Sequence, residues 1–177
     1  GVFTLVEIAG LALVIFAGRN SLATFDANKL LTIDPAVGLS GIIGGAFLAF
    51  YAFIGFEDMV NVAEETKRPE RTMPLAILIS LIVSTILYLL VATVAIATVS
   101  PAELAQSNAP LSLVYARETG SSAWFLTIIG ISAAVNGVIV QIIMGSRVLY
   151  GLSRQGWLDS RLATVDAKTK TPVLATT

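Results

Sequence analysis

The sequence contains no cysteine and no histidine, and only 13% of its residues are charged. Without cysteine there is neither a disulfide framework nor a thiolate metal site. Without histidine, the usual metal ligand and the side chain that titrates near neutral pH are both missing. No motif for a serine nucleophile replaces them, so we expect no catalytic residues, no metal and no enzyme. The net charge of -1 argues against nucleic acid as a partner.

What the sequence has in excess is apolar residues. They make up 55% of the chain, and the mean hydropathy is +0.83, too apolar for an ordinary soluble domain. The composition predicts an all-α, multi-pass membrane protein surrounded by a lipid bilayer. Because the first apolar run has no basic start, we expect the chain to begin inside a helix, as a fragment of a longer protein. The predicted spans are residues 2–17, 38–66, 74–99 and 123–147, with amphipathic segments at about 109–119 and 148–162.

The second predicted span is longer than a membrane requires. Its apolar part, from Gly38 to Phe56, is about 19 residues long, which already crosses a hydrocarbon core. The helical pattern nevertheless continues to the charged cluster that begins at Glu64. A helix of that length must tilt strongly or break. We expect a break near residues 54–57, where Gly55 is followed by paired acids.

Local signals predict the boundaries of other elements. The sequence Ser100-Pro101-Ala102-Glu103 is typical of a helix start, and a short amphipathic helix should end at Gly120. We expect Pro69 and Pro74 to end one helix and restart the next. Tyr88 and the other polar residues of the third span are assigned no role in chemistry.

The segment FYAFIGFEDMVNVAEETKRPERTMPLAI resembles the sixth transmembrane helix and following loop of amino acid permeases of the amino acid/polyamine/organocation superfamily. A second segment, residues 146–172, is similar to the stretch after the eighth helix of that family. The matching positions of the first segment are Gly55, Phe56, Glu57, Ala63, Glu64, Glu65, Thr66, Pro69, Arg71, Met73 and Pro74.

The resemblance implies a fold of two inverted five-helix repeats, of which this chain carries about the fifth to eighth helices. The remaining helices of the permease would be its partners. The implied activity is secondary transport of amino acids or related amines, without a cofactor, coupled to an ion gradient or to a counter-substrate. The substrate would lie between the broken first and sixth helices. Residues 109–119 resemble part of a lid on the outside of the site.

The resemblance also implies site residues. Tyr51 stands where the family has an aromatic gate, and Gln141 where other members place a side chain facing the substrate. A break at Gly55 would free backbone carbonyls that can accept from an ammonium group. The substrate-binding residues that we predict are therefore Tyr51, Ala52, Phe53, Ile54, Gly55 and Gln141.

The candidates for ion or proton coupling are Glu57, Glu7 and Ser132. Glu57 follows the predicted break, and a carboxylate removed from water binds a proton more readily; the alternative is an exposed acid. Glu7 either faces the bundle interior or lies in water near an interface. Some permeases have lysine at the position that corresponds to Glu7, so the coupling ion stays open. Ser132 and Gln141 can instead make hydrogen bonds between helices.

Basic residues predict the orientation, because they concentrate on the cytoplasmic side of membrane proteins. With four spans, loops 64–74 and 148–172 are cytoplasmic, in a plasma or inner membrane. The alternative to transport is a membrane scaffold or sensor that retains the permease fold but moves no substrate.

Overall fold

A computed structural model describes residues 2–26, 28, 38–55, 59, 66–166 and 176. Every regular element among them is helical, which confirms the all-α class. The helices are α1 (Val2–Ala17), α2 (Arg19–Thr24), α4 (Gly38–Phe53), α5 (Pro69–Thr98), α6 (Pro101–Gln106), α7 (Pro110–Thr119) and α8 (Trp124–Arg154), with a 3-10 turn, η2, at Ser160–Ala163.

Two of these helices, α5 and α8, are long and apolar enough to cross a membrane. They have 30 and 31 residues, which correspond to about 45 Å of helix. The apolar helices α1 and α4 are shorter, with 16 residues each. In the second predicted span, α4 ends at Phe53, directly before the residues where the break is predicted.

Two helices extend beyond the bounds expected from sequence. Helix α5 begins at Pro69 and contains Pro74, which does not restart it. Pro69 stands in the first turn, where the missing N–H has no helical partner to lose, and Pro74 removes a single further hydrogen bond. Helix α8 continues past residue 147 to Arg154, because neither Ser146 nor Arg147 stops a helix.

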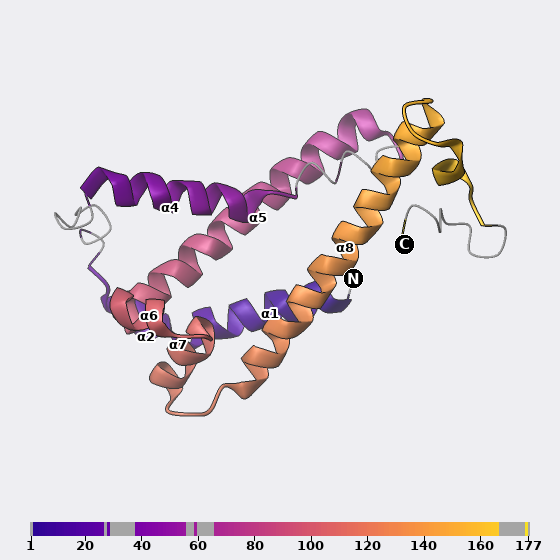
Figure 1. The fold of residues 1–177 in the computed structure, drawn as a ribbon. Coiled ribbons are helices and arrows are strands. Elements are labelled where there is room, and N and C mark those ends of the chain that lie inside the picture. Colours follow the sequence, from indigo (N-terminus) through magenta and orange to yellow (C-terminus); the bar gives the residue numbers. More distant parts are fainter. Residues whose placement is uncertain are drawn as a thin grey trace. The chain divides into compact units, whose positions relative to one another are not determined.

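The chain forms two compact units, residues 1–54 with 75–131 and residues 55–74 with 132–177. In the first unit, α2, α6 and α7 gather beside one end of α5 (Figure 1). Its buried core contains Val14, Val94, Val99, Val114, Ala123 and Leu126. These residues come from α1, α5, α7, α8 and the segments beside them, so the core joins elements far apart in the sequence.

The corner between α1 and α2 is shaped by Gly18. Its N–H donates to the Val14 carbonyl at 3.0 Å, and its carbonyl accepts from the Leu22 N–H at 2.9 Å. A Cβ atom at this position would lie 2.2 Å from Cγ1 of Val94. Only glycine lets α5 pack this closely into the corner.

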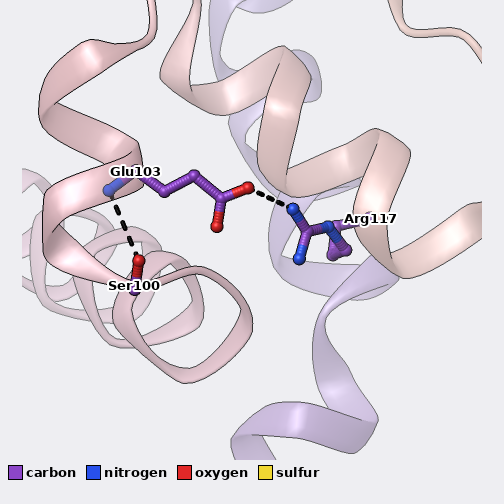
Figure 2. A network of polar contacts seen from close by, with 3 residues as sticks. All are labelled: Ser100, Glu103 and Arg117. Atoms are coloured by element: carbon purple, nitrogen blue, oxygen red, sulfur yellow. Dashed lines mark hydrogen bonds and ion pairs between the residues drawn. The ribbon is translucent and has the colours of Figure 1, made fainter.

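Two polar contacts fix the short helices of the first unit. Ser100 caps α6, because its hydroxyl accepts from the Glu103 N–H at 3.3 Å, as the sequence predicted. Glu103 also pairs with Arg117 of α7 (Figure 2). Helix α7 ends, again as predicted, at Gly120, whose φ of 68° is the left-handed conformation that glycine adopts readily.

A third polar contact is more enclosed. The Glu118 carboxylate on α7 accepts hydrogen bonds from the Ser21 hydroxyl on α2 and the Thr98 hydroxyl at the end of α5. One side chain thus connects three helices beside the apolar core.

In the second unit, the chain turns sharply after α8. Gly156 takes a φ of 80°, and the buried Ser153 hydroxyl donates to the Asp159 carbonyl at 2.6 Å. The Asp159 carboxylate accepts from the Arg161 N–H at 2.9 Å and so begins η2. The predicted amphipathic segment 148–162 therefore contains about the last two turns of α8, this turn, and the start of η2.

Candidate functional site

The candidate site begins where α4 ends. The last helical residue is Phe53, and the Ile54 N–H donates to the Tyr51 carbonyl at 3.2 Å, a tighter turn than in an α-helix. Gly55 then takes a φ of +124°. Residues that carry a Cβ atom are strained in this backbone conformation, whereas glycine is not. The local sequence therefore ends the helix by its backbone, at the glycine where the break was expected.

Ending a helix leaves carbonyl groups without helical partners, because the last four have no N–H ahead of them. At the end of α4, hydrogen bonds to the carbonyls of Tyr51 and Ala52 come from described residues. Tyr51 accepts from Ile54, and Ala52 accepts from the Tyr88 hydroxyl of α5 at 3.3 Å. Each carbonyl oxygen has a second lone pair. This end of α4 can therefore accept hydrogen bonds from a further donor, such as an ammonium group.

The aromatic residues beside this end differ in exposure. Phe53 is half-buried, and its ring meets the Tyr88 ring edge to face, with centroids 5.2 Å apart and an interplanar angle of 70°. Tyr51 is 69% exposed and Ile54 is 48% exposed. Within the first unit, Phe53 is thus held by α5, whereas Tyr51 remains open.

Tyr88, which contacts this end of α4, was assigned no role by the sequence interpretation. Its chain separation from Ala52 is 36 residues, so no local pattern connects them. One signal was available, since Tyr88 is the sole tyrosine in the apolar sequence of α5. A phenol in such surroundings usually finds a hydrogen-bond acceptor.

Ser132 and Gln141 both lie on α8, in the second unit. They are nine residues apart, which in an α-helix corresponds to two full turns and about a further 180°. The two side chains therefore lie on opposite faces of α8. Ser132 is half-buried and Gln141 is exposed. The structure therefore does not bring these two candidates together on one face of α8.

Glu7 lies on α1, in the first unit, and is half-buried. It is three residues before Gly10 and seven before Val14, which are the two buried residues of this helix. Positions with this spacing share one helix face. Glu7 is thus on the face of α1 that turns toward the core. Glu57, the remaining candidate, lies outside the described residues.

The chain was compared with known proteins. A family model described as amino acid permease matches residues 1–177. The branched-chain amino acid permease BcaP of Bacillus subtilis is 36% identical over 143 residues, which is 79% of this chain and 30% of that protein. An uncharacterized transporter of Mycobacterium tuberculosis is 33% identical over 173 residues, 96% of this chain and 38% of that protein.

A plant relative extends the comparison. The vacuolar cationic amino acid transporter 2 of Arabidopsis thaliana is 28% identical over 179 residues, 99% of this chain and 28% of that protein. The chain therefore spans between 28% and 38% of the length of these three relatives.

Proposed function

Because this chain belongs to the amino acid permease family, we propose that it forms part of a secondary transporter that carries amino acids or related amines across a membrane. The observation that supports this proposal most is the end of α4, where Gly55 has a φ of +124° and the helix stops at Phe53. A membrane-embedded helix end exposes backbone carbonyls, which is tolerated only where they line a cavity or are buried in protein. An amino acid supplies an ammonium group that fits such carbonyls.

In this proposal the substrate contacts come from Tyr51, Ala52, Phe53, Ile54, Gly55 and Gln141. The carbonyls at the end of α4 accept from the ammonium group, and Tyr51, with its exposed ring, closes over the substrate. The carboxylate of the substrate would bind largely to the broken first helix of the permease fold that the sequence resembles.

Transport is driven by an ion gradient or by exchange, and the coupling candidates are Glu57, Glu7 and Ser132. Glu7 has the clearest structural support, because it shares a face with buried Gly10 and Val14. An acid in that position is costly unless it faces the interior of the bundle.

The membrane is a plasma or inner membrane, and loops 64–74 and 148–172 face the cytoplasm. The basic residues in these loops support this orientation. They are Lys67, Arg68, Arg71, Arg154, Arg161, Lys168 and Lys170.

The relatives suggest two substrate classes for the test, since one is named for branched-chain and another for cationic amino acids. The full-length protein that contains this chain would be reconstituted into liposomes and supplied with labelled leucine, lysine and a panel of other amino acids. Saturable uptake of at least one of them supports the proposal. Absence of uptake across the panel, under proton, sodium and exchange conditions, contradicts it.

A further inference from the structure

We propose that Tyr88 is a positioning residue of the substrate site, whose hydroxyl holds the Ala52 carbonyl ready for the ammonium group of the substrate. The proposal rests on the proposed transport of amino acids. It adds a residue from α5 to a site that the sequence placed on α4 and α8 alone.

Two contacts hold the phenol of Tyr88 against the end of α4. Its hydroxyl donates to the Ala52 carbonyl at 3.3 Å, and its ring meets the Phe53 ring at a centroid distance of 5.2 Å. The hydrogen bond and the ring contact involve consecutive residues of α4. Together they hold the phenol ring beside the end of α4, with its oxygen within hydrogen-bond distance of the Ala52 carbonyl.

The carbonyl that Tyr88 contacts is one of those freed by the helix end. In an unbroken helix, the Ala52 carbonyl would accept from the N–H of residue 56. The chain turns at Ile54 and Gly55, and the Tyr88 hydroxyl donates to this carbonyl from α5. The bond directs the carbonyl and occupies one of its two lone pairs, which leaves the other for a ligand.

Tyr88 is also open enough to lie beside a ligand. Its side chain is 42% exposed within this chain, so the ring is not enclosed by the helices of its own unit. The phenol oxygen can also accept a hydrogen bond while its proton is donated to the Ala52 carbonyl. The ligand group that fits beside it is therefore the ammonium of an amino acid.

The variant that tests the proposal is Tyr88→Phe, which keeps the ring and removes only the hydroxyl. The matched control is Tyr115→Phe, the same chemical change in a second edge-to-face pair. Tyr115 of α7 faces Phe125 of α8 with centroids 5.3 Å apart and an angle of 88°. Both variants would be made in the full-length protein, and KM and kcat measured for the labelled amino acid that the parent takes up best, together with unfolding temperature.

We expect Tyr88→Phe to raise KM about three- to tenfold, the loss that corresponds to one hydrogen bond. We expect kcat within about twofold of the parent, and an unfolding temperature equal to that of Tyr115→Phe, because the ring contacts remain. KM does not depend on the amount of protein, so a modest change in expression leaves the test intact.

A purely structural hydroxyl gives a different pattern, with a lower unfolding temperature or surface level at an unchanged KM. That result overturns the proposal, as does a Tyr88→Phe protein that never reaches the membrane. If the parent itself transports no amino acid, the proposed function fails instead, and this outcome is distinguished before any variant is compared.

Discussion

Val94 of α5 lies so close to Gly18 that a Cβ atom on the glycine would be 2.2 Å from its Cγ1 atom. Val94 itself is fully buried. The corner between α1 and α2 is therefore packed directly against α5, with no room for a side chain.

The close contact predicts that Gly18→Ala destabilises the protein by about 1 to 3 kcal/mol, the usual cost of overpacking. In a Val94→Ala background the same substitution should cost less, because the methyl groups that it meets are gone. The measurement is a double-mutant cycle on the unfolding temperature of the full-length protein in detergent. Equal costs of Gly18→Ala in both backgrounds would show that the two residues do not interact.

A second prediction concerns Glu118, which accepts hydrogen bonds from Ser21 and Thr98. Glu118→Ala leaves the half-buried Ser21 hydroxyl without this acceptor, whereas the Thr98 hydroxyl keeps the Val94 carbonyl at 2.8 Å. We expect a cost of about 1 to 3 kcal/mol. The control is Glu103→Ala on α6, whose ion pair with Arg117 has side chains 45% and 50% exposed. Because exposed pairs contribute little, the control should cost under about 1 kcal/mol. If Glu103→Ala lowers the free energy of unfolding as much as Glu118→Ala does, the Glu118 hydrogen bonds do not stabilise the protein more than an exposed ion pair.

Parts of this fold could be predicted from the sequence because their signals are local. The cap at Ser100, the end of α7 at Gly120 and the end of α4 before Gly55 each depend on residues within one or two turns. The upstream start of α5 and the length of α8 were missed for a related reason. Proline early in a helix and polar residues late in one weaken a helix without ending it.

The contacts between helices could not be predicted in this way. Ala52 and Tyr88 are 36 residues apart, and Ser21 and Glu118 are 97 apart. Hydrophobic periodicity shows which face of a helix is apolar, but it does not name the residue on the opposite helix. For the same reason the sequence analysis placed Tyr51 and Gln141 by position in a family pattern, and it did not connect Tyr88 with Ala52.

Tyr51 is predicted to act as a gate rather than as a packing residue. With 69% of its side chain exposed within this chain, Tyr51→Ala should leave the unfolding temperature within a few degrees of the parent and lower the turnover of substrate. The matched control is Phe47→Ala, one turn earlier on the same face of α4 and 70% exposed. Surface level, unfolding temperature and kcat would be measured for both. Similar kcat values for Tyr51→Ala and Phe47→Ala would show that Tyr51 does not act as a gate.

Glu57 is predicted to make transport depend on pH, because it directly follows the helix end at Gly55. A carboxylate in a site from which water is excluded binds a proton more readily than one in water. Glu57→Gln should therefore flatten the pH profile of uptake. Glu103→Gln, a change in a surface ion pair, should leave the profile as it is in the parent. An unchanged profile in Glu57→Gln would exclude this acid from coupling.

The central claim is that the end of α4 at Gly55 forms part of the substrate site, and one comparison of alanine variants tests it most directly. At both Gly55 and Gly44 a Cβ atom would meet nothing within 4 Å among the described residues, but Gly55 alone of the two has a positive φ, +124°. An alanine at Gly55 is strained by about 1 to 3 kcal/mol, and this strain favours an unbroken helix. We therefore predict that Gly55→Ala lowers the binding and uptake of the labelled substrate by about tenfold or more in well-expressed full-length protein, whereas Gly44→Ala stays within about twofold. Normal binding and uptake in Gly55→Ala would contradict the account.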